Sequence, residues 1–266
     1  MKKSTWLGRA WIVAVALVLG PVIRSTSAAA SQANFHHVHL NVTDAPAAAK
    51  WYADNLGGQQ KKIGFFAAVG FDKTTIIFFQ VKAGFPGSVG SVVDHIGFSC
   101  RDIHAKMKEL EAAKVDIVSG VEQEGPIKYA FIKDPWGTLI EMVEDPESVG
   151  FHHVHLASID PRAAIDWYTG AFGGQPGRFA GLIPGVRYGD VWLLVKKVEQ
   201  PRAPTKGRSI DHISWSFDDL DQSAKELKAR QVHFESDPFA FGTGKIAFVV
   251  DPWGARIELV GPAAKK

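Results

Sequence analysis

Apolar and polar residues alternate along several short segments of the chain. In the first of them, Val38, Leu40 and Val42 alternate with polar residues. A β-strand places successive side chains on opposite faces, so such alternation predicts a strand with one apolar face. The same pattern begins again at residues 95, 153 and 212, and each strand is followed by a helix-like stretch. The expected helices are residues 45–56, 103–114, 161–172 and 220–230.

A fixed histidine-to-aspartate spacing occurs where each predicted strand is followed by its helix. A histidine is followed seven residues later by an aspartate, four times along the chain: His37 and Asp44, His95 and Asp102, His153 and Asp160, His212 and Asp219. An aspartate in this place predicts a helix N-cap, which accepts hydrogen bonds from the first-turn N–H groups. The sequence therefore predicts four units, each a strand, a helix and about three further strands, in an α+β fold.

A longer repeat groups these units in pairs. Residues 35–40 return unchanged as residues 151–156, and the Asp-Pro-Trp-Gly of residues 134–137 returns at residues 251–254. The latter tetrapeptide is typical of a turn between two hairpin strands. Two tandem domains are expected, one at 34–147 and one at 148–262, with a short tail at 263–266.

The N-terminal residues 1–33 form a separate segment. Lys2, Lys3 and Arg9 precede an apolar stretch at residues 11–22, and small residues follow at 27–33. This order is typical of a secretory signal peptide. An uncleaved membrane anchor is the alternative, but the stretch is shorter than the roughly 20 apolar residues that span a bilayer. We expect an exported protein, periplasmic or secreted, whose mature chain begins between Ala29 and Asn34.

Removing the leader changes the charge of the chain. The full sequence carries 30 basic and 28 acidic residues, and the leader holds four of the basic ones and no acid. The mature chain is then slightly acidic, which gives no reason to expect nucleic acid as a partner. No segment after the leader is apolar enough to span a membrane. Cys100 is the one cysteine, so disulfides and cysteine-rich metal sites are excluded.

The four aligned histidines share the polar face of their strands. Glu141 and Glu258 lie inside strongly apolar final strands, where an unpaired buried carboxylate costs several kcal/mol. Imidazoles and a carboxylate on one face are a good donor set for a divalent first-row metal. A lone strand histidine is more often a hydrogen-bonded core residue, but here both residue types occur in both halves. We therefore predict metal binding in at least one half. His36 and His152 are expected at a rim, and His104 and His233 on the surface.

The pattern resembles the vicinal oxygen chelate superfamily of glyoxalases, extradiol dioxygenases and fosfomycin- and bleomycin-resistance proteins. The matching motifs are His37-x6-Asp44 with Trp51-Tyr52 and Gly57-Gly58, Asp94–Phe98, and Asp134–Gly137 followed by Glu141, all of which recur in the second half. The resemblance implies that two units form a curved mixed sheet around a metal-binding cleft. The implied metal ligands are His37, His95 and Glu141 in the first half and His153, His212 and Glu258 in the second.

The resemblance also implies a divalent ion, up to one per domain, that acts as a Lewis acid on vicinal oxygens of a small-molecule substrate. Zinc, nickel, manganese and iron are all compatible. Glyoxalases take a fourth ligand from the last strand of the first unit, where Gln80 is the only candidate replacement here. Extradiol dioxygenases place a tyrosine ten residues before the glutamate, where this chain has Phe131 and Phe248. These departures favour a lyase or isomerase.

His39 and His155 lie two residues from a predicted ligand, on the same strand face. Each is expected to act as a general base, or instead to make a hydrogen bond across the cleft. Tyr129, Phe131 and Phe248 are the expected substrate contacts. Three alternatives stay open: a non-catalytic binding or resistance protein, an extradiol-type dioxygenase, and a chain with only one active half. The sequence does not predict an oligomeric state.

Overall fold

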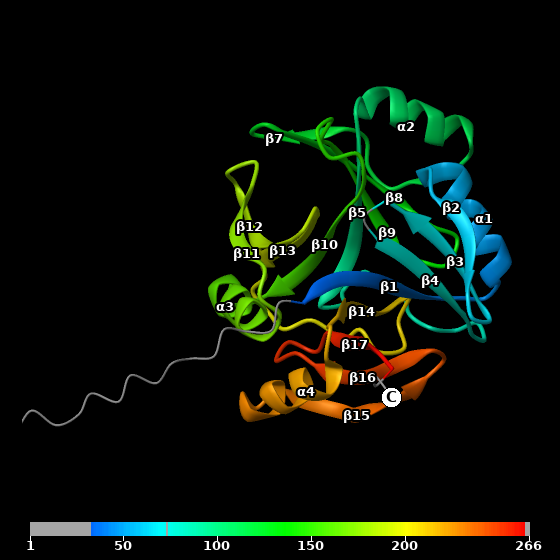
Figure 1. Cartoon of the computed structure of the whole chain (residues 1–266). Coiled ribbons are helices and arrows are strands. Elements are labelled where there is room, and N and C mark those ends of the chain that lie inside the picture. Colours follow the sequence, from blue (N-terminus) through cyan, green and yellow to red (C-terminus); the bar gives the residue numbers. More distant parts are fainter. Residues whose placement is uncertain (1–32, 73, 264–266) are drawn as a thin grey trace, which may run out of the picture.

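The computed structural model describes residues 33–72 and 74–263 (Figure 1), so the predicted leader lies outside the described residues except for Ala33. The four helices are α1 (Ala45–Leu56), α2 (Ile103–Ala112), α3 (Pro161–Phe172) and α4 (Leu220–Ala229). The strands of the first half are β1 (Asn34–Val42), β2 (Gln59–Ile63), β3 (Phe66–Phe71), β4 (Thr74–Gln80), β5 (Val93–Cys100), β6 (Asp116–Ile117), β7 (Glu122–Glu124), β8 (Ile127–Lys133) and β9 (Leu139–Glu144). Those of the second half are β10 (Gly150–Ser158), β11 (Gln175–Phe179), β12 (Ile183–Tyr188), β13 (Val191–Lys197), β14 (Ile210–Ser216), β15 (His233–Phe241), β16 (Gly244–Val250) and β17 (Arg256–Pro262).

The elements form the four predicted units: unit 1 (β1 to β4), unit 2 (β5 to β9), unit 3 (β10 to β13) and unit 4 (β14 to β17). Each helix begins after the aspartate that the sequence marked. The carboxylate of Asp44 accepts from the backbone N–H of Ala47, and the other three aspartates cap their helices in the same way. The α+β fold and the four units are confirmed.

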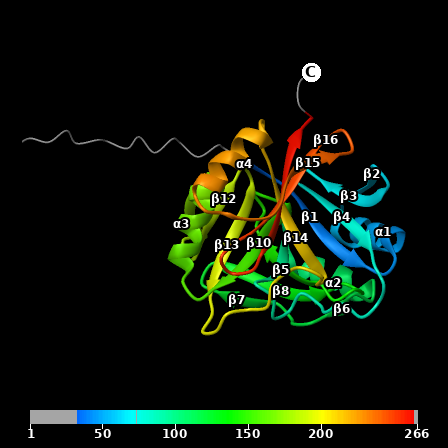
Figure 2. The same cartoon turned by 90° about the horizontal axis from the view of Figure 1, so that it is seen from below.

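The sheets, however, do not follow the tandem halves. One sheet has the order β15-β16-β17-β14-β1-β4-β3-β2 and so joins unit 1 to unit 4. The other has the order β11-β12-β13-β10-β5-β9-β8-β6 and joins unit 3 to unit 2, with β7 paired to β8. Figure 2 shows β1 beside β14 near the centre of the molecule. The expectation that each half builds its own sheet is therefore wrong.

Units of the same half are connected through side chains instead. The Tyr52 hydroxyl on α1 donates to Asp134 in the turn of unit 2, at 2.8 Å. Tyr168 on α3 makes the same bond to Asp251 in unit 4, also at 2.8 Å. Both aspartates also accept backbone N–H groups of their own turn. The repeated Trp-Tyr and Asp-Pro-Trp-Gly motifs thus join units 1 and 2, and units 3 and 4.

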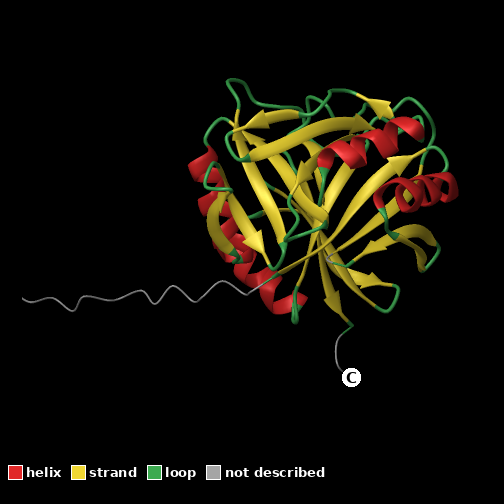
Figure 3. Ribbon diagram, turned by 90° about the horizontal axis from the view of Figure 1, so that it is seen from above, coloured by secondary structure: helices red, strands yellow, loops and turns green. Residues whose placement is uncertain are grey.

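The helices lie on the outside of the strands (Figure 3). The apolar strand faces and the inner faces of the helices form one continuous core. It crosses between the sheets where the rings of Phe35 and Phe151 lie 6.1 Å apart. Among the described residues, no helix is both long and apolar enough to span a membrane. Because the apolar strand faces pack in this core, the histidine-bearing faces point away from it.

Each sheet curls around its histidine-bearing face. Phe66 on β3 and Phe241 on β15 are six strands apart in the sheet order, which would separate them by about 29 Å in a flat sheet. Their ring centroids are only 6.5 Å apart. In the other sheet, Leu182 at the β11–β12 turn lies against Gly125 at the β7–β8 turn. The curled sheets bring distant units together over the same inner face.

Candidate metal sites

The first cluster consists of His37, His39, His212 and Glu258, all buried. β1 supplies the first two residues, β14 supplies His212 and β17 supplies Glu258. The ladder pairs His39 with His212, and Ser214 with Glu258, so the four side chains share one face. Oε2 of Glu258 lies 3.1 Å from Nε2 of His37 and 3.0 Å from Nε2 of His212, and Nδ1 of His39 lies 2.8 Å from the latter nitrogen.

The second cluster consists of His95, Glu141, His153 and His155, also buried. It repeats the arrangement of the first on β5, β9 and β10. Oε2 of Glu141 lies 3.0 Å from Nε2 of His95 and 3.2 Å from Nε2 of His153. Nδ1 of His155 lies 2.7 Å from Nε2 of His95 and 3.9 Å from the carboxylate. Two candidate metal sites of identical composition result.

All six residues expected as ligands lie in these clusters, but their grouping differs from the one that the resemblance implied. His37 does not join His95 and Glu141; it joins residues of unit 4. Likewise His153 joins residues of unit 2. The reason is the strand pairing described above, in which β1 pairs with β14 and β10 with β5. Each cluster therefore needs both halves of the chain.

His39 and His155 lie among the donor atoms rather than beside them. Each directs Nδ1 at its cluster, and the Nε2 atom of each is buried without a hydrogen-bond partner. Their possible role as ligands was missed from the sequence. The signal was present, since each lies on the same strand face as its neighbour two residues before.

An outer carboxylate holds one histidine of each cluster. Oδ1 of Asp94 lies 2.7 Å from Nδ1 of His95, and Oδ1 of Asp211 lies 2.6 Å from Nδ1 of His212. Such carboxylate–histidine pairs fix the tautomer and orientation of metal-binding histidines. Sequence analysis assigned no role to either aspartate, although each directly precedes its histidine.

Some contacts inside the clusters bring two acceptor atoms together and therefore require a cation between them. Because Asp94 accepts from Nδ1 of His95, a neutral His95 ring has its lone pair on Nε2. That nitrogen lies 3.0 Å from Glu141, whose carboxylate is also an acceptor. Two acceptors at this distance repel each other unless a proton or a metal ion lies between them. The same holds for His212 and Glu258.

The spacing of the donor atoms also fits a metal ion. With ligand distances of about 2.1 Å, tetrahedral donors are about 3.4 Å apart, and adjacent octahedral donors about 3.0 Å apart. The second cluster combines contacts of 2.7, 3.0 and 3.2 Å with one of 3.9 Å. These separations are close to those between donor atoms that share one ion.

Burial and charge set the protonation of the clusters. Burial lowers the pKa of His153 to about 3 and that of His155 to about 4, which leaves both rings neutral and able to bind a metal. Burial opposes the charged form of His95 too, but hydrogen bonds to Asp94 and Glu141 raise its pKa. The pKa of Glu141 is well below its usual range, because the surrounding histidines outweigh its burial.

The aromatic residues expected to contact substrate flank the clusters. Phe131 pairs with Glu141 across the strands, and its ring packs edge-on to His95 at 5.4 Å. Phe248 is placed in the same way beside Glu258, with its ring 5.4 Å from His212. Tyr129 packs on Phe131 at 5.8 Å, and its hydroxyl donates to Glu122 at 3.2 Å.

Other candidate residues lie outside the clusters. Gln80 is exposed and accepts from the backbone N–H of Ala45, so it does not replace the missing glyoxalase ligand. Cys100 is buried, which raises the pKa of its thiol to about 11. His104 and His233 are exposed, as expected. His36 is exposed, but its counterpart His152 is buried, so the expected rim position is wrong for His152.

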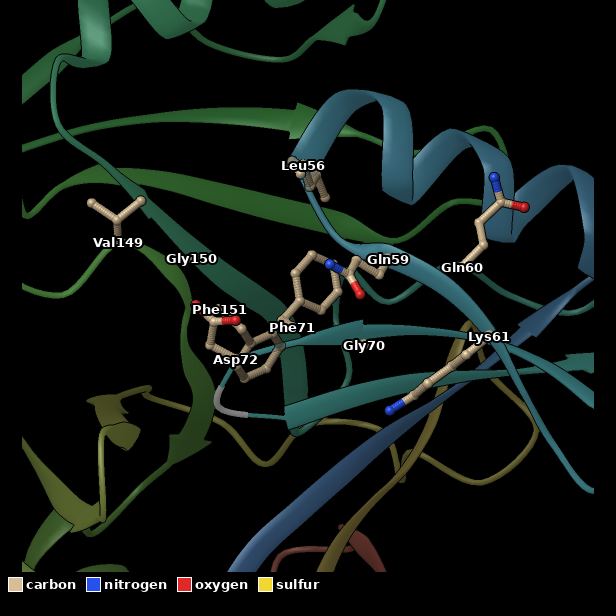
Figure 4. A pocket seen from close by; sticks show the side chains of 11 residues that line it. Leu56, Gln59, Gln60, Lys61, Gly70, Phe71, Asp72, Val149, Gly150 and Phe151 are labelled. Carbon is tan, nitrogen blue, oxygen red and sulfur yellow. The ribbon is translucent and has the colours of Figure 1, made fainter.

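A surface hollow of about 490 Å³ lies apart from both clusters (Figure 4). It is lined by Leu56, Gln59 and Lys61 on one side and Val149 to Phe151 on the other. None of its lining residues belongs to either cluster, and it adds no metal-binding group to them.

Comparison with known proteins agrees with this architecture. The family model described as Glyoxalase/Bleomycin resistance protein/Dioxygenase superfamily matches residues 34–142 and 150–259. Glyoxalase I from Zea mays superimposes with a TM-score of 0.69 at 17% sequence identity, covering 87% of this chain and 93% of that one. A putative dioxygenase from Bacillus subtilis gives 0.66 at 17% identity, covering 88% and 86%. A comparison with curated protein sequences found no match. At these identities the structures demonstrate a shared fold only.

Proposed function

The chain belongs to the glyoxalase/bleomycin resistance protein/dioxygenase superfamily, and on this basis we propose that it is an exported, metal-dependent lyase or isomerase. Its substrate is a small molecule that binds through two neighbouring oxygen atoms. The observation that carries the proposal is the convergence of three imidazole nitrogens and one carboxylate oxygen, twice, at the spacing of metal ligands.

Each cluster would hold one divalent ion through its three histidines and its glutamate. In a six-coordinate site these four donors leave two positions, which is what a substrate with two vicinal oxygens requires. A bound ion supplies Lewis acidity, which stabilises negative charge on a substrate oxygen. The buried setting excludes water from this charge and strengthens its electrostatic interactions.

His39 and His155 then have a further task. When Nδ1 of such a ring faces the metal, its proton is on Nε2, and that atom has no partner within the described residues. The ring can therefore donate a hydrogen bond to a substrate oxygen. It cannot serve as a general base in this state, because it has no free lone pair. Ligand and base are exclusive roles, and the geometry favours the ligand.

Metal content of the mature protein, purified without chelators, tests the proposal. We expect close to two ions per chain by elemental analysis, and none in a Glu141→Gln/Glu258→Gln variant with unchanged circular dichroism. Metal-free wild-type protein that also fails to take up zinc, nickel, manganese or iron would contradict it. Stoichiometric metal without turnover on any oxygenated substrate would instead favour a binding or resistance protein.

We predict that catechol ring cleavage is absent. Phe131 and Phe248 occupy the strand position beside each glutamate and have no hydrogen-bond donor, while the Tyr129 hydroxyl is engaged with Glu122. The Fe(II)-loaded protein should consume no oxygen with a panel of catechols. Turnover above roughly 1 s⁻¹, within the ordinary range for enzymes, would establish a dioxygenase instead.

Export is proposed from the leader sequence. The mature N-terminus should fall between Ala29 and Asn34. Ala33 is buried, and its backbone N–H donates to the carbonyl of Phe172, which favours a cut that retains Ala33. N-terminal sequencing of protein from the cell envelope checks this prediction, and an intact Met1 on cytoplasmic protein would refute it.

A further inference from the structure

We propose that the two clusters accept different ligands: the first cluster prefers an aromatic ring that carries neighbouring oxygen donors, and the second, where charged residues replace three of the surrounding phenylalanines, has no such preference. This inference rests on the proposed metal sites. It comes from the residues around the clusters, which differ between the two sheets although the donor sets are identical.

The internal repeat allows the surroundings to be compared position by position. In the first sheet Phe239 pairs with Ile246 and Phe241 with Gly244; at the same register of the second sheet, Glu122 pairs with Tyr129 and Glu124 with Ile127. Phe79 is also replaced by a charged residue. It pairs with Asn41 in the first sheet, and Lys196 pairs with Ala157 at the same register of the second. Phe65 and Phe66 at the start of β3 correspond to Leu182 and Ile183 at the start of β12. We call the five phenylalanines the first mouth and their five counterparts the second mouth: Leu182, Ile183, Lys196, Glu122 and Glu124.

Two rings of the first mouth contact a histidine of its cluster. The ring of Phe79 stacks on His39 with centroids 4.0 Å apart, and Phe66 meets the same histidine edge-on at 5.6 Å. Phe66 in turn packs on Phe79 at 4.7 Å and faces Phe241 at 6.5 Å. These rings extend outward from the cluster to the surface.

Several of these rings remain open to solvent. Phe65 is 80% exposed and Phe241 is 44% exposed. Exposed apolar surface that continues into a buried polar cluster is typical of a ligand site. Aromatic rings at stacking and edge-on distances offer faces to another planar ring, an arrangement that favours an aromatic ligand over an aliphatic one.

The second mouth has charged residues at three of the five places and aliphatic residues at the other two. Lys196 is paired with Asp94 at 2.8 Å and is therefore engaged with the outer carboxylate of its cluster. Glu122 accepts from Tyr129, and Glu124 lies exposed on the same short strand. The stacked phenylalanines of the first mouth have no counterpart here. A phenyl group on a ligand therefore finds no phenylalanine of this kind to stack on at the second mouth.

A matched pair of chelators tests the difference. Benzohydroxamate and acetohydroxamate both bind a metal through two adjacent oxygens and differ in a phenyl against a methyl group. Titration calorimetry would use two zinc-loaded variants: His153→Ala/His155→Ala, which keeps the first cluster, and His37→Ala/His39→Ala, which keeps the second. We expect the first cluster to bind benzohydroxamate about 10-fold or more tightly than acetohydroxamate, since a buried ring of this size is worth at least that ratio. The second cluster should bind the two within about 3-fold.

Exchanging one residue between the mouths provides the control. Phe241→Glu in the first-cluster protein should remove most of the aromatic preference. Val89→Glu, at a residue 57% exposed and outside both mouths, should leave it unchanged. Equal preference at both clusters, or a preference unaffected by Phe241→Glu, would overturn the inference.

A metal-free measurement separates this inference from the proposed function. In chelator-treated wild-type protein, the fluorescence of anilinonaphthalene sulfonate should rise on binding, fall with Phe241→Glu and stay unchanged with Glu124→Gln. If the protein takes up no metal but this pattern holds, the metal function fails and the difference between the mouths stands. If metal binds at both clusters but this fluorescence pattern is absent, the proposed metal function stands and the difference between the mouths is refuted.

Discussion

The two clusters have the same donors and differ in what holds those donors in place. In the first, the outer carboxylate Asp211 is bound by Arg256 from β17, at 2.9 Å. In the second, Asp94 is bound by Lys196 from β13, at 2.8 Å. The cation thus comes from opposite sides of the histidine strand, although the repeat would place it on the same side. Both outer carboxylates thus have a cationic partner, but the two partners come from positions that the repeat does not relate to each other.

A second difference lies beneath the histidines of β1 and β10. Ser214 pairs with His37, whereas Gly97 pairs with His153. A Cβ atom on Gly97 would lie 1.9 Å from the His153 ring, so that ring occupies the space of the missing side chain. Ser214 has a Cβ atom, so the His37 ring cannot occupy the corresponding space, although its Nε2 atom still lies 3.1 Å from Glu258. Identical donor sets are thus held by different neighbouring residues in the two clusters, and the contribution of each neighbour can be tested separately.

The largest expected effect concerns the grouping of the ligands. His37→Ala combined with His212→Ala should remove one metal ion and leave the second cluster loaded, because both residues belong to the first cluster. His37→Ala combined with His95→Ala should remove both ions. Elemental analysis of the two double variants decides between groupings. The grouping within sequence halves requires the opposite result, with one ion lost in the second variant and two in the first.

Gly97→Ala should damage only the second cluster. The added methyl group must displace the His153 ring, so we expect loss of one metal equivalent while the first cluster stays loaded. Ser214→Ala is the matched control, since it keeps a Cβ atom and should retain both ions. A Gly97→Ala protein with two tightly bound ions would show that the close packing of this ring is not needed.

Neutralising the outer carboxylates should have a smaller effect. Asp94→Asn keeps an acceptor for His95 but loses the charge, and metal affinity of the second cluster should fall about 10–100-fold. Asp211→Asn should do the same for the first cluster. Competition titration with a chromophoric chelator measures both. Lys196→Met should weaken the second cluster less than Asp94→Asn, and an equal or larger loss would mean that the lysine acts on the metal directly.

The sequence was sufficient for features that depend on neighbouring residues. Strand alternation gave the polar face of each histidine, and each His-x6-Asp spacing placed a helix cap that the structure confirms at Asp44. The partners of each strand could not be predicted in this way. Alternation specifies a face but not which strand lies beside it, so the pairing of β1 with β14 had no local signal.

The role of His39 as a candidate metal ligand was not predicted, because it depends on which ring nitrogen the side chain presents. From the sequence, His39 was expected to act as a general base or to make a hydrogen bond across the cleft; alternate residues of a strand, such as His37 and His39, are about 6–7 Å apart. The structure brings them together with different nitrogens. His37 uses Nε2, at the far end of its ring, and His39 uses Nδ1, nearer the backbone. A one-dimensional pattern carries no information on which nitrogen a ring presents.

The pairing of unit 1 with unit 4, and of unit 2 with unit 3, fixes the order in which the donors of the two sites are synthesised. The donors of the second cluster are complete once His155 has been made, and its sheet ends with β13. The first cluster has to wait for Glu258, about a hundred residues later, which is about 5–20 s of synthesis. Until β14 has been made, β1 lacks this neighbour, and closing the long loop between the two strands adds an entropic cost. A chain that ended near residue 200 would contain all four donors of the second cluster and only His37 and His39 of the first.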